Sequence, residues 1–314
     1  MGVTKSAKIW HNGNLVDWDE ARIHVLSHVV NYGTSIIEGL RCYATPQGPA
    51  LFRLGEHLQR LLNSAKVYRI AAGYDRAQLE QACIELIRVN RLPSAYVRPI
   101  VLRGYGGMGV GVRADENPVE VFIAAWEWTH YLGGAAQTQG VDVRISSWRR
   151  IAPDTLPAMA KAAANYMNSQ LMKQEAFADG YAEGIALDTA GQLSEGSGEN
   201  VWLLREGKLF TPPLSSSVLP GVTLDCVRQI AAEMAIEVRQ EPIPREALYL
   251  ADEAFLCGTA VEITPIKSVD RIPIGSGTPG PVTLAIQRRF FALAKGEAPD
   301  LYGWRTPVEV PVGV

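Results

Sequence analysis

Residues 157–200 read PAMAKAAANYMNSQLMKQEAFADGYAEGIALDTAGQLSEGSGEN, and this stretch decides how the rest of the chain is interpreted. Lys161 lies in it among small apolar residues, which usually pack against another part of a protein. An amine in such surroundings costs free energy unless it is paired or used. Burial disfavours its charged form, and a neutral amine can attack a carbonyl group. Lys161 is therefore a candidate Schiff-base lysine, and a helical lysine that reaches into water is the alternative.

The end of the same stretch supplies a carboxylate. Glu195 lies within the small residues of LSEGSGEN, which predict a turn before an apolar strand over residues 201–204. A carboxylate in such a turn is a candidate functional group, and an ordinary solvated acidic turn explains it equally well.

Length and composition exclude several classes of protein. At 314 residues, with 47% hydrophobic and 20% charged residues, the chain fits a soluble protein of two domains. A net charge of −3 provides no basic surface for nucleic acid, and no apolar run is long enough to cross a membrane. The histidines lack the spacing of a metal site. The scattered cysteines predict buried free thiols in a reducing compartment, the cytoplasm; they are Cys42, Cys83, Cys226 and Cys257.

The first part of the chain has the pattern of an α+β domain. Asn12-Gly13 predicts the turn of a hairpin over residues 8–18. Further strands are expected over 22–26, 38–43, 50–53, 96–102 and 119–126, and helices over 56–66 and 78–89. The stretch GYGGMG at 104–109 matches G-x-G-x-x-G. Because no helical pattern follows it to receive a pyrophosphate, we interpret it as a loop and not as a dinucleotide site.

The second part is predicted to hold strands over 141–147, 184–188, 201–204 and 253–257. Helices are expected over 158–178, 224–235 and 282–294. We place a small domain at 1–127, an interdomain loop at 128–139 and a large domain at 140–314. The tail from residue 306 has little to pack and is expected to be mobile.

Two turns combine a hydroxyl with exposed backbone amides. Thr223 follows LPGV at the start of a predicted helix, where amides attract an anion. A plain threonine cap explains that position as well. Thr259 lies in the small-residue turn GTAVE at 258–262. Together with a buried lysine and a carboxylate, these turns supply what pyridoxal phosphate needs for its aldehyde, its ring nitrogen and its phosphate. No G-x-S-x-G motif supports a hydrolase.

The sequence resembles the branched-chain amino acid aminotransferases of pyridoxal-phosphate fold type IV, from about residue 7 to residue 304. The motifs that carry the resemblance are VNYGTSIIEGLRCY, FRLGEHLQRL, SAYVRP, GGMGVG, AKAAANY, GYAEGIALD, SEGSGENVW, LFTPP, LPGVT and LADEAFLCGTAVEITP. The pair SAYVRP and GGMGVG favours the branched-chain subgroup over the D-amino-acid enzymes. The resemblance implies a two-domain fold of mixed α and β structure, with a small α+β N-terminal domain, a larger C-terminal domain with a barrel-like β core, and the cofactor at the domain interface.

The resemblance also implies roles at the cofactor. Lys161 would bind the aldehyde and then move a proton at the substrate Cα, and Glu195 would hold the ring nitrogen. Tyr166 would hydrogen-bond the phenolate oxygen. Arg60 would bind the phosphate, although its place off the apolar face of its helix is also typical of a solvated arginine. The other expected cofactor contacts are Leu219, Val222, Thr223 and Thr259.

Roles at the substrate follow in the same way. The amides of Thr259 and Ala260, supported by Tyr96, would bind the α-carboxylate, and Arg98 would bind the side-chain carboxylate of glutamate. The residues expected to line the side-chain pocket are Ile37, Trp128, Tyr131, Tyr166 and Leu219. The residues expected to reach in from the partner subunit of a homodimer, which could assemble into a hexamer of dimers, are Tyr32, Met108 and Val110. Ile37 stands where the best-known members carry an aromatic residue, so the pocket wall is expected to be recessed there.

The implied reaction is transamination between L-leucine, L-isoleucine or L-valine and 2-oxoglutarate, which gives branched-chain 2-oxo acids and L-glutamate. Three alternatives use the same fold: a transaminase for D-amino acids or (R)-amines, an aminodeoxychorismate lyase, and a non-catalytic protein that binds pyridoxal phosphate. Neither nucleic acid nor a membrane is expected as a partner.

Overall fold

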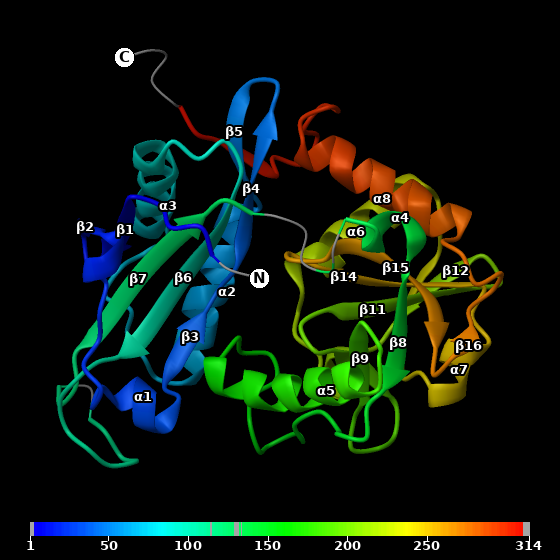
Figure 1. The fold of residues 1–314 in the computed structure, drawn as a ribbon, viewed down its shortest axis with the longest axis horizontal. Coiled ribbons are helices and arrows are strands. Elements are labelled where there is room, and N and C mark those ends of the chain that lie inside the picture. The colour runs from blue at the N-terminus through cyan, green and yellow to red at the C-terminus, as the bar shows by residue number, and fades with distance from the viewer. Residues whose placement is uncertain (1–2, 114, 129–131, 133, 310–314) are drawn as a thin grey trace. The chain divides into compact units, whose positions relative to one another are not determined.

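The computed structural model describes residues 3–113, 115–128, 132 and 134–309 of the chain. The described residues form two compact units (Figure 1). The first unit draws on residues within 1–128, 160–164 and 293–314, and the second on residues within 129–159 and 165–292. A short segment that contains Lys161 and the C-terminal part of the chain thus belong to the first unit. The domain boundaries inferred from the sequence stay a prediction.

The first unit is built on an antiparallel sheet. Among its described residues, seven of the eight strands lie in the order β17-β5-β4-β6-β7-β1-β2, and the eighth, β3, pairs with β6. The strands are β1 (Lys8–His11), β2 (Asn14–Asp17), β3 (Ser35–Ile37), β4 (Leu40–Thr45), β5 (Gly48–Phe52), β6 (Ala95–Arg103), β7 (Val119–Trp126) and β17 (Arg305–Pro307). The predicted hairpin of β1 and β2 is confirmed, because Asn12 and Gly13 both adopt the positive φ angles that its tight turn requires.

Helices provide the other half of this unit's core. They are α1 (His28–Tyr32), α2 (Leu54–Val67) and α3 (Arg76–Asn90), with a short 3-10 turn at Trp18–Glu20. Leu58 and Leu61 of α2 and Leu79 and Leu86 of α3 are fully buried in one cluster with strand residues. The α3 start is fixed by a capping box between Asp75 and Gln78. Both long helices were predicted from their apolar spacing, and both predictions are confirmed.

The second unit contains a mixed sheet. Eight of its nine described strands lie in the order β10-β9-β8-β15-β14-β11-β12-β13, and the ninth, β16, pairs with β15. The strands are β8 (Val141–Ile145), β9 (Glu183–Leu187), β10 (Leu193–Gly196), β11 (Asn200–Arg205), β12 (Lys208–Thr211), β13 (Val238–Gln240), β14 (Glu253–Gly258), β15 (Glu262–Val269) and β16 (Ile272–Pro273). The helical elements are α4 (Ala136–Gln139), α5 (Tyr166–Ala178), α6 (Val222–Glu233), α7 (Arg245–Tyr249), α8 (Pro281–Ala294) and the 3-10 turns Ala163–Asn165 and Leu214–Ser216.

Four predictions about local structure are wrong. The helix expected over 158–178 begins only at Tyr166, because the backbone before it bonds to other parts of the first unit. Glu195 lies in strand β10 and not in a turn. Residues 22–26 form no strand. Val25 is 70% exposed, so the apolar residues of this segment do not pack against a core as those of a half-buried strand would. The tail expected to be mobile from residue 306 adds β17 to the sheet, and Val308 is buried.

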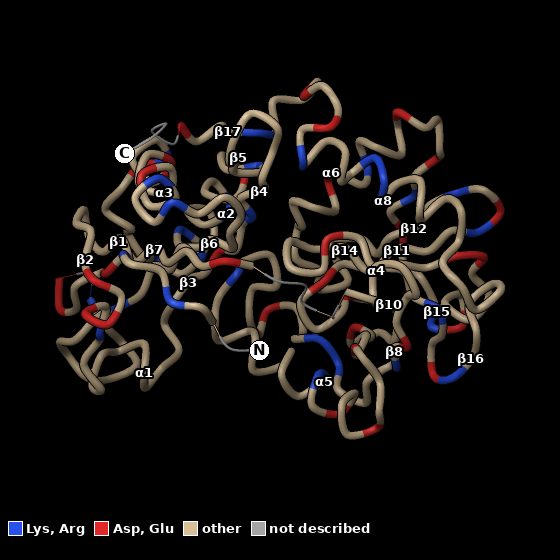
Figure 2. Tube along the Cα trace, turned by 45° about the horizontal axis from the view of Figure 1, so that its top comes forward, with Lys and Arg blue, Asp and Glu red and all other residues tan. Residues whose placement is uncertain are grey.

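Surface and cysteine predictions can also be compared with the structure. The four cysteines are buried free thiols, as predicted. Basic and acidic residues are interspersed over both units, in keeping with the small net charge (Figure 2). Within the described part of the chain, no helix has both the length and the apolar character needed to cross a membrane.

Candidate active site

Lys161 lies in the first unit on an extended segment that is anchored on two sides. Its backbone N–H donates to Ser64 Oγ of α2 at 3.0 Å, and its carbonyl oxygen accepts from the Ile37 N–H of β3 at 3.0 Å. Ala160 and Ala162 on either side are each 2% exposed, which explains why this segment needs small residues. The Lys161 side chain is half-buried. The alternative of a helical lysine is therefore wrong, and the segment holds this lysine beside β3.

Arg60 belongs to a charged group centred on Glu38. Glu38 is fully buried and accepts from Arg60 Nε at 2.6 Å and from Arg60 Nη2 at 3.0 Å. His57 Nδ1 lies 2.8 Å from Glu38 Oε2, the oxygen that Arg60 Nη2 also contacts. Since the Arg60 side chain is only 11% exposed, the alternative of a solvated arginine is wrong. Glu38 fixes the orientation of the Arg60 guanidinium through a two-pronged contact.

The protonation of this group is set by its charges. Burial alone would raise the pKa of Glu38, but the Arg60 charge and the hydrogen bond with His57 outweigh it and hold that pKa well below the ordinary carboxyl range. Burial lowers the pKa of His57 against the opposing effect of Glu38, and the charges of Arg60 and Lys161 lower it further. Lys161 therefore lies close enough to influence His57. The group consists of an ionised carboxylate, a cationic guanidinium and a histidine that favours its neutral form.

Tyr96, Arg98 and Trp128, which the resemblance assigns to the substrate, lie close together in the first unit. Arg98 Nη2 donates to Tyr96 Oη at 3.0 Å, and its guanidinium lies 5.2 Å from the centre of the Tyr96 ring. Tyr96 stacks on Trp128 with ring centres 4.6 Å apart. A Cβ at Gly39 would lie 1.8 Å from Tyr96 Oη, so only glycine lets the tyrosine hydroxyl approach the backbone there. The first unit thus presents a cation against aromatic rings.

Glu195 lies in the second unit, and donors contact both of its carboxylate oxygens. Arg150 Nη2 is 2.8 Å from its Oε1, and the Leu219 N–H donates to its Oε2 at 2.9 Å. Asn200 Nδ2 donates to the same Oε2 at 3.2 Å. Glu195 is 5% exposed. An acceptor held by a guanidinium, an amide and a backbone N–H is arranged as an ionised carboxylate.

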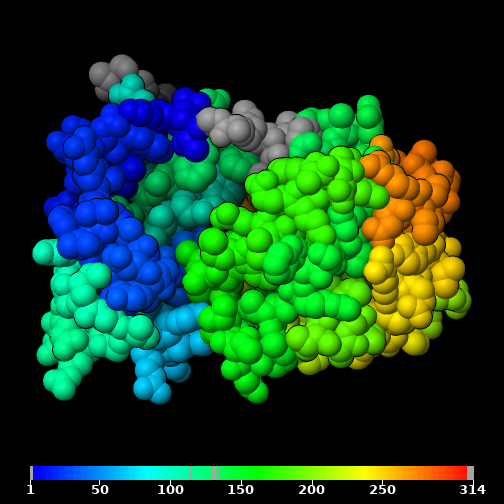
Figure 3. Space-filling model, turned by 60° about the horizontal axis from the view of Figure 1, so that its bottom comes forward, coloured from blue at the N-terminus to red at the C-terminus, as the bar shows by residue number. Residues whose placement is uncertain are grey.

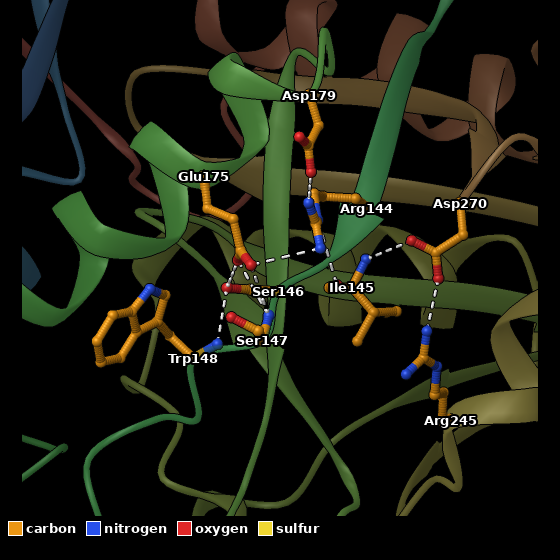
Figure 4. Close-up of polar contacts among 9 residues, drawn as sticks. All are labelled: Arg144, Ile145, Ser146, Ser147, Trp148, Glu175, Asp179, Arg245 and Asp270. Atoms are coloured by element: carbon orange, nitrogen blue, oxygen red, sulfur yellow. Dashed lines mark hydrogen bonds and ion pairs between the residues drawn. The ribbon is translucent and has the colours of Figure 1, made fainter.

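Arg150 is itself fixed by the chain around it. Its backbone N–H donates to the Leu187 carbonyl at 3.0 Å, and its Nη1 donates to Asn168 Oδ1 of α5 at 3.1 Å. Further along α5, Glu175 contacts the hydroxyl of Ser146 and accepts from the Ser147 N–H at 3.0 Å (Figure 4). Helix α5 therefore holds the segment between β8 and Arg150 at two points.

The start of α6 has no side-chain cap. Its N-cap is Gly221, which has no side chain that could bond the first amides of the helix. A Cβ at Gly221 would lie 1.9 Å from Asn200 Oδ1, so glycine is required for this packing. Asn200 also donates to the Leu219 carbonyl at 3.1 Å. The predicted residues Leu219, Val222 and Thr223 thus lie beside the partners of Glu195.

The remaining predicted residues are placed as follows. Thr259 and Ala260 are half-buried in the turn between β14 and β15, as expected, and Tyr166 begins α5. Tyr32, Met108 and Val110 lie on the surface of the first unit with exposed fractions of 39%, 52% and 87%. Tyr131 falls outside the described residues. The structure leaves the roles of all these residues as predictions.

Four residues that contact predicted site residues were not singled out from the sequence: Glu38, His57, Arg150 and Asn200. Glu38 carried a weak signal, since its charged side chain lies among apolar residues, whereas His57 carried none, since Glu56, Gln59 and Arg60 surround it. Arg150 carried none, because it follows Arg149 in a segment without periodicity. Asn200 lies between the acidic motif that holds Glu195 and an apolar strand. The apolar pattern predicts the strand but gives no role to the Asn200 side chain.

Comparisons with known proteins agree with these observations. A family model described as amino-transferase class IV matches residues 35–269. The chain is 50% identical over 308 residues to the branched-chain-amino-acid aminotransferase of Salmonella typhimurium, covering 98% of this chain and 99% of that protein. The crystal structure of the Escherichia coli branched-chain amino acid aminotransferase matches with a TM-score of 0.95 and 50% identity, over 97% of this chain and 100% of that chain.

A more distant structure is that of the branched-chain amino acid aminotransferase from Thermobaculum terrenum in its PLP-form. It matches with a TM-score of 0.90 and 34% identity, over 97% of this chain and 99% of that chain. These matches confirm the predicted fold type. The chain therefore belongs to the class IV aminotransferase family and, within it, to the branched-chain-amino-acid aminotransferases.

Proposed function

We propose that this protein transfers the amino group of L-leucine, L-isoleucine or L-valine to 2-oxoglutarate, giving branched-chain 2-oxo acids and L-glutamate, with pyridoxal phosphate as cofactor. The observation that carries the proposal is the environment of Glu195. Its carboxylate is buried and receives donors from Arg150, Asn200 and the Leu219 amide. A carboxylate kept ionised in this way can hold a proton on a pyridine nitrogen, which is what a pyridoxal enzyme requires.

The residues present fit this cofactor. The uncapped start of α6 offers backbone amides to a phosphate, and Thr223 adds a hydroxyl beside them. The relative from Thermobaculum terrenum was determined in a PLP-form. When bound, pyridoxal phosphate supplies an aldehyde that binds amino groups and a ring that withdraws electrons from the substrate Cα.

Lys161 is assigned two tasks: to bind the cofactor aldehyde and to move the proton at the substrate Cα. Both tasks need the amine to be held in position. The hydrogen bonds from the Lys161 backbone to Ser64 and Ile37 fix the segment that carries it. His57 stands near enough for the Lys161 charge to affect it. The ionised Glu38 balances the cationic charge of Arg60 within the same buried group.

The phosphate is assigned to Arg60, to the amides of Val222 and Thr223, and to the hydroxyl of Thr259. An arginine suits a phosphate because its planar fork matches two phosphate oxygens. Glu38 binds the Nε–Nη2 edge through two hydrogen bonds and so orients the whole guanidinium. Tyr166 is assigned to the phenolate oxygen of the cofactor, and Leu219 is a further cofactor contact.

Substrates of two kinds must use one set of residues. The amides of Thr259 and Ala260, with Tyr96, bind the α-carboxylate. Arg98 binds the side-chain carboxylate of glutamate and 2-oxoglutarate, and its position against the Tyr96 ring lets aromatic surface face an apolar side chain instead. The walls around the side chain are assigned to Ile37, Trp128, Tyr131, Tyr166 and Leu219.

A homodimer is part of the proposal. Tyr32, Met108 and Val110 are apolar or aromatic and yet exposed in the single chain. The loop that carries Met108 lies beside the segment that carries α1 (Figure 3), where His28 Nε2 is 2.9 Å from the Gly109 carbonyl oxygen. Such a surface is typical of one covered by a partner. Sedimentation of the purified protein tests this, and a monomer at micromolar concentration would remove the dimer from the proposal.

The reaction itself is tested with a substrate panel. Purified protein is incubated with pyridoxal phosphate, 2-oxoglutarate and one amino donor, and glutamate formation is measured. We expect turnover with L-leucine, L-isoleucine and L-valine that exceeds turnover with D-alanine or (R)-1-phenylethylamine by orders of magnitude. Preference for the last two donors would assign the protein to the alternative transaminases. A protein that stays colourless with the cofactor and inert with leucine would contradict both the proposed reaction and the alternative transaminases.

A further inference from the structure

Glu199 follows the glycine turn after Glu195, and its carboxyl group faces inward. The residue is only 4% exposed, which does not fit the alternative of an ordinary solvated acidic turn. Its Oε2 accepts from the Gly198 N–H at 3.0 Å, and its carbonyl oxygen accepts from the Gly196 N–H at 2.7 Å. A Cβ at Gly196 would lie 2.6 Å from Glu199 Oε2, so the side chain folds back tightly over the turn.

A second buried carboxyl group meets it. Glu183 of β9 is 0% exposed, and its carboxyl group lies close enough to that of Glu199 to raise the Glu199 pKa through its charge and a side-chain hydrogen bond. Lys173 of α5 is ion-paired with Glu183 Oε2, and the Gly184 N–H donates to Glu183 Oε1 at 2.8 Å. Glu183 therefore has the partners of an ionised carboxylate. Two carboxyl groups can share a hydrogen bond only if one of them is protonated, and the arrangement leaves Glu199 as the donor.

We propose that Glu199 is a positioning residue that carries a proton in the working protein, and that the resulting Glu199–Glu183–Lys173 cluster holds the turn which places Glu195. The cluster then contains one cation, one anion and one neutral acid, and its charges balance. The roles of Glu195 rest on the proposed function, whereas the proton on Glu199 is a property of the folded chain alone.

The connection to Glu195 is short and direct. The backbone of the turn is closed by the hydrogen bond from Gly196 to Glu199, immediately after Glu195. On the other side of Glu199, Asn200 donates to Glu195 Oε2 at 3.2 Å. If Glu199 lost its proton, it would repel Glu183 and strain the turn at both ends. Glu195 and its Asn200 partner would then be displaced together.

The charges around Glu199 favour the protonated form. Burial raises the pKa of Glu199, the Glu183 charge raises it further, and Lys173 opposes them; the result is a pKa of about 8. From β14, Cys257 also faces this group, and burial raises the pKa of its thiol well above neutrality, so it contributes no charge near pH 8. Glu183 on β9, Lys173 on α5 and Cys257 on β14 are thus the titratable groups that face Glu199.

The effect of pH on stability has a definite sign. The unfolded chain loses the Glu199 proton near the ordinary value of 4.5, whereas the folded chain keeps it until about pH 8. Between these values the folded state binds one proton more, so stability falls as the pH rises. The stability that the Glu199 proton contributes is fully present below pH 4.5 and is lost above about pH 8.

The variant Glu199→Gln tests this without removing the contacts. A glutamine amide has one oxygen that accepts from Gly198 and one nitrogen that donates to Glu183, which is the pattern of a protonated acid. We expect the full chain with this substitution to fold and to lose the pH dependence. Relative to the variant, the unfolding constant of the wild type should rise by up to about tenfold per pH unit between pH 5 and 8. The control Glu206→Gln, at a side chain that is 80% exposed, should show no such change.

A second measurement uses the wild type itself. Infrared spectra of the full chain at pH 6 should contain the carbonyl band of a protonated buried carboxylic acid, which Glu199→Gln lacks and which disappears as the pH is raised above 9. Both experiments are performed with and without pyridoxal phosphate, and neither depends on turnover. Equal pH profiles of wild type and Glu199→Gln, or an unchanged carbonyl band, would overturn the proposal. Failure of the protein to bind cofactor would affect the proposed function and leave the proton on Glu199 intact.

Discussion

The backbone N–H of Ile37 donates a hydrogen bond of 3.0 Å to the carbonyl oxygen of Lys161. This contact joins β3 to the segment that carries the candidate catalytic lysine, and Ile36 and Ala162 continue it as an antiparallel bridge. Residue 37 is therefore adjacent in space to the backbone of Lys161, although it is far from it in the sequence. Its half-buried side chain is well placed to influence which substrates are accepted.

Ile37→Phe should shift specificity toward leucine. A phenyl ring fills the recess expected at this position, so the larger substrate phenylalanine should lose more binding than leucine does. Each buried methylene contributes about 0.8 kcal/mol, so the ratio of the two kcat/KM values should change by roughly a few-fold to tenfold. Ile84→Phe, at a half-buried position of α3, is the control. If the ratio does not move in favour of leucine, Ile37 does not set specificity.

Glu38→Gln should make the protein less stable at neutral pH and less sensitive to acid. Glu38 has a lowered pKa when folded, so its contribution to stability is present above the ordinary carboxyl value of 4.5 and is lost as the pH falls below it. The variant leaves Arg60 buried without its counter-charge, at a cost of about 3–5 kcal/mol. Denaturant midpoints measured from pH 3 to 7 test this. Parallel profiles for wild type and variant would show that Glu38 is not held ionised.

Glu195→Gln should impair catalysis beyond its effect on folding. The amide cannot hold a proton on a ring nitrogen, so the half-reaction with leucine should slow on the order of a hundredfold or more. Loss of the charge also leaves Arg150 without its partner, which costs about 3–5 kcal/mol of stability. Rates are therefore measured well below the melting temperature of the variant. An unchanged half-reaction would remove Glu195 from its assigned role.

Gly221→Ala should weaken cofactor binding. The added Cβ would lie 1.9 Å from Asn200 Oδ1, so Asn200 must move and its hydrogen bond to Glu195 is lost. A hydrogen bond to a charged group contributes about 1.5–3 kcal/mol, which corresponds to about a tenfold to hundredfold loss of affinity for pyridoxal phosphate. Gly198→Ala, where no atom lies within 4 Å of the added Cβ, is the matched control. Equal affinities for both variants would contradict this reading of the α6 start.

Local patterns in the sequence predicted much of the secondary structure. The apolar spacing of α2 and α3 and the Asn12-Gly13 turn are short-range signals, so they could be recognised without knowledge of the fold. The alanine-rich segment around Lys161 was misread as a helix because its propensity favours one. Its hydrogen bonds go instead to Ser64 and Ile37, and contacts of that kind cannot be read from a local pattern.

The candidate site was recovered only in part, for a similar reason. Lys161 and Glu195 could be singled out because each is a charged residue in an unusual local setting. Glu38 and Arg150 act through partners that are distant in the sequence, so the residues near Arg150 give no indication of its role and those near Glu38 give only a weak one. The presence of residues 160–164 and 293–309 in the first unit is likewise a property of the whole fold.

The central claim is that Lys161 is the residue that binds the cofactor aldehyde. The most direct measurement incubates the protein with pyridoxal phosphate, reduces it with sodium borohydride and maps the labelled peptide by mass spectrometry. The account predicts a phosphopyridoxyl group on Lys161, and it predicts that Lys161→Ala folds, lacks the label and loses several powers of ten in rate. A label on a different lysine, or near-normal turnover in Lys161→Ala, would contradict it.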